Sequence, residues 1–241
     1  MSVVALAALI RERRPCVVLT GAGVSTQSGI PDFRSATGIW ADVDPFEVAS
    51  IQAFRRDPAR VWSFYRERID LLRAAEPNAA HRALAELERR GFVQALVTQN
   101  IDTLHARAGS SDVVEVHGSI RSAECPSCLG VEPAEAVLEQ LEESDVPSCP
   151  RCGETLKPGV VLFGEVLPAG AMDRATLLAR GAQLMLVVGS SLEVWPVAGL
   201  PLEARACAIV NRGPTALDEQ ALLKVDAGAG ETLTAVLDAL R

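Results

Sequence analysis

Residues 21–35 read GAGVSTQSGIPDFRS, and the prediction of the fold starts from this stretch. It follows the run CVVLT (16–20), whose uninterrupted apolar and β-branched residues are typical of a buried parallel strand. A strand that ends in Gly-x-Gly and then turns can present backbone N–H groups to a phosphate, because glycine lacks the Cβ that would block the approach. Asp32, Phe33 and Arg34 follow in a row, so the turn carries more side-chain chemistry than a structural turn needs.

The glycines only partly match the dinucleotide fingerprint G-x-G-x-x-G. Gly21 and Gly23 fit, but Thr26 occupies the third glycine position. The acidic residue that binds the ribose in dehydrogenases is also missing, because the next strand, 94–98, runs into Gln-Asn-Ile-Asp at 99–102. The pattern favours a nucleotide phosphate site over a plain strand-to-helix turn, and it disfavours a hydride-transferring dehydrogenase.

Length and composition indicate one large globular domain or a domain with an insert. The chain has 241 residues, of which 49% are apolar, enough for a sizeable core. No apolar run is long enough to span a membrane and no signal peptide is visible, so we expect a cytoplasmic protein without a membrane partner. The formal net charge of −8 argues against an obligate nucleic acid partner. The oligomeric state stays open, and a monomer is compatible with the sequence.

Strand-like and helix-like segments alternate along most of the chain. Apolar strand-like runs occur at 16–20, 93–98, 112–116, 183–189 and 206–210. Helix-like segments between them include 81–90 and 169–180. This alternation predicts an α/β fold with a parallel sheet and helices on both faces. Residues 31–78, rich in aromatic and charged residues, and residues 119–158 do not follow the alternation.

Four cysteines form two Cys-x-x-Cys pairs, Cys125 with Cys128 and Cys149 with Cys152. Two such pairs predict a tetrahedral zinc site, and four thiolates leave no position for water, so we expect structural zinc. Four unliganded cysteines or two disulfides are the alternatives, and a reducing cytosol disfavours both. The other two cysteines lie in apolar strand-like runs and are expected to be inert core residues.

Three histidines can be weighed one by one. His81, near a helix start, and His105, in a segment expected to turn helical, are interpreted as structural. His117 lies between the strand-like run 113–116 and Gly118, where a strand would end in a cleft. An imidazole there has an ordinary pKa of about 6.5, which suits a general base.

Seven motifs, in order and at matching spacings, resemble those of the sirtuins, which are NAD-dependent protein-lysine deacylases. They are GAGVSTQSGIPDFR (21–34), TQNIDTLHARAG (98–109), VHG (116–118), the two Cys-x-x-Cys pairs, KPGVVLFGE (157–165), GSSLEVWP (189–196) and VNRG (210–213). The nearest subgroup is the bacterial and archaeal deacetylases and desuccinylases. The resemblance implies a Rossmann-like NAD-binding domain from residues 1–30, 79–118 and 159–241, and a smaller domain from a helical insertion (31–78) and a zinc-binding insertion (119–158).

The resemblance also implies a reaction and residue roles. NAD would be cleaved at its nicotinamide–ribose bond as the acyl oxygen attacks, and His117 would act as general base toward free lysine and O-acyl-ADP-ribose. Asn100 and Asp102 would hold the nicotinamide carboxamide, with the amide as donor and the carboxylate as acceptor. The implied NAD-binding residues are Gly21, Ala22, Gly23, Ser25, Asp32, Phe33, Arg34, Gln99, Asn100, Ile101, Asp102, Gly189, Ser190, Ser191, Asn211 and Ala229.

The substrate side is implied in the same way. The stretch KPGVVLFGE (157–165) could be one more core strand, whereas the resemblance implies that residues 160–165 form an edge that pairs with the acyl-lysine peptide, opposite Glu193 and Val194. Tyr65 and Arg68, at helical i, i+3 spacing, match a pair that binds the carboxylate of succinyl or malonyl groups; a solvated helix face is the alternative. The implied substrate-binding residues are Ala49, Tyr65, Arg68, Val160, Phe163, Gly164, Glu165 and Val194.

Two other functions compete with protein deacylation. An NAD-dependent mono-ADP-ribosyltransferase would break the same bond to nicotinamide, and acyl-lysine dependence of nicotinamide release distinguishes the two. A non-enzymatic zinc-ribbon module with a degenerate nucleotide fold would be expected to lack His117, Asn100 or Asp102, and all three are present.

Overall fold

The computed structural model describes residues 3–33 and 38–241. Six parallel strands form its main sheet, in the order β3-β2-β1-β7-β8-β9. They are β1 (Cys16–Thr20), β2 (Val93–Thr98), β3 (Val113–Glu115), β7 (Met185–Val188), β8 (Cys207–Val210) and β9 (Leu223–Val225). Numbered along the chain within this sheet, the order is 3-2-1-4-5-6, that of doubly wound nucleotide-binding sheets. The predicted parallel sheet is confirmed, and β9 is an additional strand too short to be seen in the sequence pattern.

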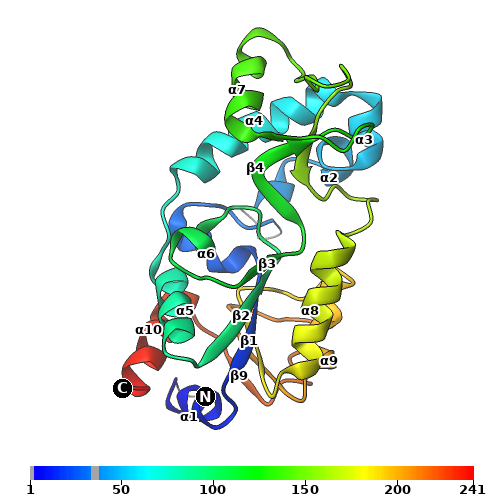
Figure 1. Ribbon diagram of the computed structural model, residues 1–241. Helices are drawn as coiled ribbons and strands as arrows, with labels where there is room; N and C mark the ends of the chain where they lie inside the picture. The colour runs from blue at the N-terminus through cyan, green and yellow to red at the C-terminus, as the bar shows by residue number, and fades with distance from the viewer. Residues whose placement is uncertain (1–2, 34–37) are drawn as a thin grey trace.

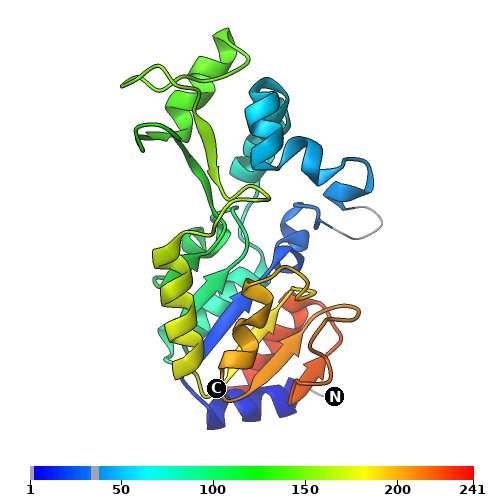
Figure 2. The same ribbon diagram turned by 90° about the vertical axis from the view of Figure 1, so that its right-hand side faces the viewer.

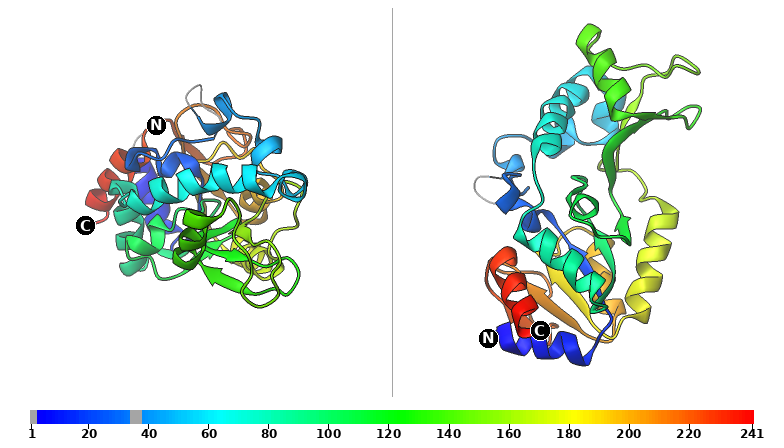
Figure 3. Two further views of the ribbon diagram at one scale, coloured as in Figure 1. Left: turned by 90° about the horizontal axis from the view of Figure 1, so that it is seen from above. Right: turned by 60° about the vertical axis from the view of Figure 1, so that its left-hand side comes forward.

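Helices cover both faces of the sheet (Figures 1 and 3). One face carries α1 (Val3–Glu12), α5 (Ala79–Arg89) and α10 (Ala229–Ala239), and the other carries α8 (Ala169–Gly181) and α9 (Leu200–Glu203). Along β1, alternate side chains serve the two cores: Val18 packs with Leu84 and Leu233, and Val17 packs with Ala175 and Ala179. Every residue of β1 is buried because the sheet is covered on both sides.

A smaller body lies beyond the carboxyl ends of the main strands (Figures 1 and 2). It contains the helices α2 (Pro45–Val48), α3 (Ile51–Arg56), α4 (Pro58–Ala74) and α7 (Ala134–Glu143), and an antiparallel sheet of β5 (Val131–Pro133), β4 (Gly118–Glu124) and β6 (Lys157–Val160). These segments share one apolar core, in which Trp62 of α4 is fully buried against Leu156 and Val137. The Trp62 Nε1–H donates to the Leu156 carbonyl at 2.7 Å, so α4 is fixed to the start of β6.

Short turns occupy the remaining functional stretches. The glycine-rich stretch after β1 contains two 3₁₀ turns, η1 (Ala22–Val24) and η2 (Thr26–Ser28). The other short elements are η3 (Ile39–Ala41), the one-turn helix α6 (Leu104–Arg107) and η4 (Val197–Gly199). Strand β6 ends at Val160, so only the first four residues of the stretch 157–165, all buried, form a core strand. Beyond it, Phe163 pairs with Ser50 in an isolated parallel bridge. In the part of the chain that the structure describes, every helix is too short or too polar to cross a lipid bilayer.

Candidate active site

The loops after β1 and β7 meet backbone to backbone at the centre of the sheet. A Cβ at Gly21 or Gly23 would lie 2.9 Å from the Gly189 carbonyl oxygen, and a Cβ at Gly189 would lie 2.3 Å from the Val24 nitrogen. Gly189 has φ +63, in the left-handed region. The point between β1 and β7 is where the strand order reverses, and ligands of such sheets bind there. The glycines therefore allow two loops to close together at the position expected for a nucleotide.

A cavity of about 1200 Å³ opens at this point and extends to the smaller body. It brings together nearly all the predicted nucleotide-binding, catalytic and substrate-binding residues, from Gly21 after β1 to Tyr65 on α4. Ala229 lies instead in an adjoining cavity of about 280 Å³, which shares Gly23 and Asn211 with the larger one. Arg34 lies outside the described residues.

Asn100 and Asp102 follow β2 and are buried in a network of hydrogen bonds. Ser25 Oγ donates to Asp102 Oδ2 at 2.6 Å, and Asp102 Oδ1 accepts from the Leu104 N–H at 3.0 Å. The side-chain amide of Asn100 donates to the Gly21 carbonyl at 3.2 Å and to Ser25 Oγ at 3.0 Å. Both N–H groups of that amide are thus engaged within the protein, and the contact of Asn100 with a bound carboxamide stays a prediction. The Asp102 carboxylate keeps further acceptor positions.

His117 follows β3 and is partly buried at the base of the cavity. Its Nδ1 lies 2.9 Å from the Gln99 carbonyl oxygen, which can only accept, so Nδ1 carries the proton and Nε2 keeps its lone pair. Burial lowers the pKa of His117 from 6.5, and the Gln99 carbonyl partly opposes this. The imidazole is therefore neutral at pH 7 and can accept a proton at Nε2.

The other two histidines lie beside this site, next to Ser25 and Thr20. His81 completes a capping box with Asn78 at the start of α5, and its Nε2 lies 3.4 Å from Ser25 Oγ. His105 lies 2.9 Å from Thr20 Oγ1, and the two imidazole rings are 4.8 Å apart. Burial lowers the pKa of His81 to about 4 and that of His105 well below 6.5, so both are neutral. Their predicted structural roles are consistent with this geometry.

Gln99 and Ser190 join the two strand ends across the cavity. Gln99 Nε2 donates to Ser190 Oγ at 3.0 Å, and Ser190 Oγ accepts from the Leu192 N–H at 3.2 Å. Asn211, after β8, donates to the Arg212 carbonyl at 2.9 Å. The polar side chains predicted for the nucleotide therefore line the carboxyl ends of β1, β2, β7 and β8.

Aromatic rings cover the opposite wall. Trp40 stacks on Phe33 with ring centroids 5.4 Å apart and on Phe64 at 5.9 Å. Trp40 was not among the predicted site residues, although it follows the glycine-rich stretch 21–35 by only five residues. Nothing in the local pattern indicates that its ring bridges that stretch and α4.

Tyr65, Arg68 and Ala49 all line the cavity. The Arg68 guanidinium carbon lies 3.4 Å above the Phe64 ring, and Nη1 donates to the Phe64 carbonyl at 2.8 Å. No described residue accepts a hydrogen bond from its buried Nε. Burial raises the pKa of Tyr65, with a further rise from nearby Glu165 and an opposing effect of Arg68. The pair thus lies on a half-buried helix face, which differs from the fully solvated face considered as the alternative. Arg68 Nε is a hydrogen-bond donor without an acceptor among the described residues.

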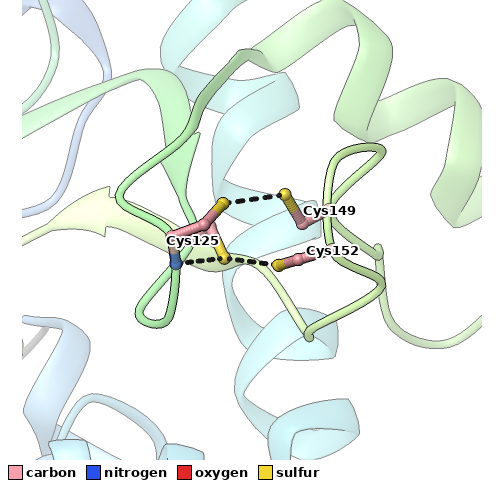
Figure 4. A group of neighbouring side chains, drawn as sticks. Cys125, Cys149 and Cys152 are labelled. Carbon is pink, nitrogen blue, oxygen red and sulfur yellow. Dashed lines mark hydrogen bonds between the residues drawn. The ribbon is translucent and has the colours of Figure 1, made fainter.

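The four paired cysteines converge at the tip of the smaller body (Figure 4). Their Sγ atoms all lie within 4.8 Å of one another, and the Cys125–Cys152 and Cys128–Cys149 sulfurs are 3.4 and 3.5 Å apart. Four sulfurs at about 2.3 Å from a tetrahedral zinc ion would be about 3.8 Å apart, so this set fits zinc. None of the four is in a disulfide.

Comparison with known proteins adds the family. A model described as "Sir2 family" matches residues 21–196, which is most of the chain. The chain belongs to the Sir2 family. The match begins at Gly21, the first glycine after β1, and ends at the last residue of the GSSLEVWP motif. It therefore includes all the residues that line the cavity except Asn211, Arg212 and Pro214.

Relatives match this Sir2 chain nearly end to end. The NAD-dependent protein deacetylase of Chromobacterium violaceum is 47% identical, over 93% of this chain and 92% of the relative. The NAD-dependent protein deacylase 2 of Archaeoglobus fulgidus is 43% identical, over 98% and 94%. A solved structure of Sir2 with a deacetylated p53 peptide and 3'-O-acetyl ADP-ribose superposes with a TM-score of 0.94 at 41% identity, and covers 99% of this chain and 98% of that one. The predicted fold class and family are confirmed.

Proposed function

We propose that this protein removes acyl groups from lysine side chains of other proteins, with NAD as co-substrate and zinc as a structural ion. The observation that carries the proposal is the neutral imidazole of His117: burial lowers its pKa, and the Gln99 carbonyl fixes the proton on Nδ1, so Nε2 can accept one. His117 lines the cavity together with the predicted nucleotide-binding residues and residues 160–165. NAD supplies an activated ribosyl carbon when its nicotinamide leaves. His117 Nε2 would take a proton from a ribose hydroxyl, which is the role its tautomer permits.

Other residues would bind and orient. The Asp102 carboxylate would accept from the nicotinamide amide, with Ser25 and Asn100 fixing its position. Phe33, stacked on Trp40, would shield the reacting sugar from water. None of the four clustered cysteines lines the cavity, and four sulfur ligands leave no open position on the ion, so zinc would act through folding.

Acyl-lysine-dependent release of nicotinamide tests the proposal. The assay follows free nicotinamide and deacylated peptide by mass spectrometry, with NAD and an acetyl-lysine peptide. We expect both products in equal amounts, and no release of nicotinamide with the unmodified peptide. Nicotinamide release with an unmodified protein acceptor, accompanied by ADP-ribose attached to that acceptor, would instead establish the mono-ADP-ribosyltransferase. Loss of turnover in His117→Ala with an unchanged melting temperature would support the assigned base.

We further propose that succinyl and malonyl groups are substrates. The buried Arg68 Nε and its neighbouring Nη2 form a fork that matches a carboxylate, and Tyr65 lies one helical turn away. Ala49, small and 4% exposed, leaves room beside them.

The matched pair Arg68→Met and Arg66→Met tests the acyl preference. Arg66 lies on the same helix but is exposed, and it donates to the Leu141 carbonyl at 2.7 Å in the smaller body. Arg68→Met should lower kcat/KM for succinyl-lysine by about a hundredfold, because a buried charge-assisted pair is lost, and should change deacetylation by less than about threefold. Arg66→Met should leave the ratio of the two activities unchanged. Equal loss of both activities in Arg68→Met would refute the carboxylate role.

A further inference from the structure

Lys157 makes an unusual set of contacts next to the segment proposed to bind the peptide. The chain contains 21 arginines and only two lysines, Lys157 and Lys224. Lys157 is 7% exposed, at the first position of β6. Its Nζ donates to the Val160 carbonyl at 2.7 Å and the Pro158 carbonyl at 3.0 Å, and lies 3.2 Å from Glu165 Oε2. All three N–H groups of the ammonium therefore have acceptors at hydrogen-bonding distance.

These contacts close residues 157–165 into a loop. Glu165 Oε2 also accepts from the Leu162 N–H at 2.8 Å, and the Glu165 N–H donates to the Leu162 carbonyl at 3.0 Å. The Lys157 ammonium thus joins the end of β6 to the turn in which Glu165 lies. Buried and paired, this ammonium neutralises a carboxylate that would otherwise face the cavity uncompensated.

The same loop touches the other parts of the site. The Val161 N–H donates to the His117 carbonyl at 2.9 Å, and the Phe163 N–H donates to the Ala49 carbonyl at 2.8 Å. Residues 160–165 of this loop line the cavity, while its other contacts hold His117 and Ala49. A peptide that adds to this edge as a strand would need the edge to be preformed.

We propose that Lys157 is a positioning residue for the acyl-lysine peptide, which it serves by holding the 157–165 loop through the two carbonyls and Glu165. This inference rests on the proposed deacylase function. An ammonium suits this site because its three donors radiate from one atom to three acceptors at 2.7–3.2 Å, whereas the donors of a guanidinium lie in one plane and are spread over three nitrogens. The choice of lysine here, in a chain with 21 arginines and only one other lysine, is consistent with that requirement.

Steady-state kinetics of Lys157→Met, Lys157→Arg and the matched control Lys224→Met test the inference. Lys224 is the other paired lysine; its Nζ contacts Asp218 and the Gly213 carbonyl, away from the peptide side. We expect Lys157→Met to raise the KM for an acetyl-lysine peptide by at least about tenfold, with the KM for NAD within about threefold. Lys157→Arg should show the same increase, and Lys224→Met should leave the peptide KM within about twofold of wild type.

Several outcomes would overturn the inference. They are an unchanged peptide KM in Lys157→Met, an equal rise of both KM values, a wild-type peptide KM in Lys157→Arg, or the same effect in Lys224→Met. If Lys157→Met does not fold, Lys157→Met/Glu165→Gln removes both charges, keeps an acceptor for the Leu162 N–H, and should raise the peptide KM in the same way. If the wild-type protein shows no acyl-lysine-dependent release of nicotinamide, the proposed deacylase function itself is wrong. This result is distinguishable from a failure of the Lys157 inference, in which the wild-type protein is active.

Discussion

Gly189→Ala tests the packing of the two loops at the centre of the sheet. Placing a residue with a Cβ at φ +63 costs about 1–2 kcal/mol. The new Cβ would also lie 2.3 Å from the Val24 nitrogen, so η1 has to move away from β7. That movement breaks the hydrogen bonds from Gly21 to Val188 (3.2 Å) and from Gly23 to Gly189 (2.9 Å), each worth about 0.5–1.5 kcal/mol. We expect a loss of about 2–5 kcal/mol.

Gly91→Ala is the matched control. Gly91 also has a left-handed φ, +73, but a Cβ there meets nothing within 4 Å, so it isolates the backbone strain. Thermal unfolding should show a fall of about 2–8 °C for Gly91→Ala and a clearly larger one for Gly189→Ala. Added NAD should raise the melting temperature of Gly91→Ala as it does that of wild type, and should have little effect on Gly189→Ala. Equal melting temperatures and equal NAD responses in the two variants would refute the reasoning.

Three further predictions follow from the metal site and the histidines. Chelation of zinc should unfold the smaller body and abolish turnover, seen by circular dichroism and activity together; full activity in a zinc-free folded protein would contradict this. The pH profile of kcat/KM should lose activity on the acid side with a midpoint below 6.5, since burial lowers the pKa of His117, and a midpoint above 7 would exclude it as the base. His81 has a folded pKa of about 4 against 6.5 unfolded, so the unfolded chain binds more protons between these values and stability falls as pH drops through that window. His81→Gln keeps a capping-box side chain and should flatten this fall in urea denaturation; parallel curves for variant and wild type would contradict it.

Much of the fold and of the site could be predicted because the signals are local. An apolar strand followed by glycines specifies a buried parallel strand and its turn within about ten residues. Paired cysteines specify their own geometry in the same way, and the sulfurs do converge. The polar residues after β1, β2, β7 and β8 meet because carboxyl ends of parallel strands share one edge of the sheet.

Other parts of the site depend on contacts between distant segments, and no local pattern indicates them. The donors of Asn100 are used by Gly21 and Ser25, more than 70 residues away in the chain, so composition alone could not show that they are engaged. Trp40 bridges Phe33 and α4 only because the smaller body folds over the stretch that follows β1. β9 has three residues and is defined by its pairing with β8.

His117 lies where the chain passes from the main sheet to the smaller body, and in the proposed function this would let one cleft serve two substrates. Its ring is fixed by the Gln99 carbonyl after β2, and its own carbonyl accepts from the Val161 N–H in the loop that follows β6. Gly118, the next residue, begins β4 with φ +74, and a Cβ there would lie 2.3 Å from the Gly159 carbonyl oxygen. The chain therefore passes from the main sheet to the smaller one within a single residue of the imidazole. In the proposed function, a nucleotide bound at the main sheet and a peptide bound along the 157–165 loop would lie on either side of His117. A shift of either segment would then move the imidazole that is proposed as the base.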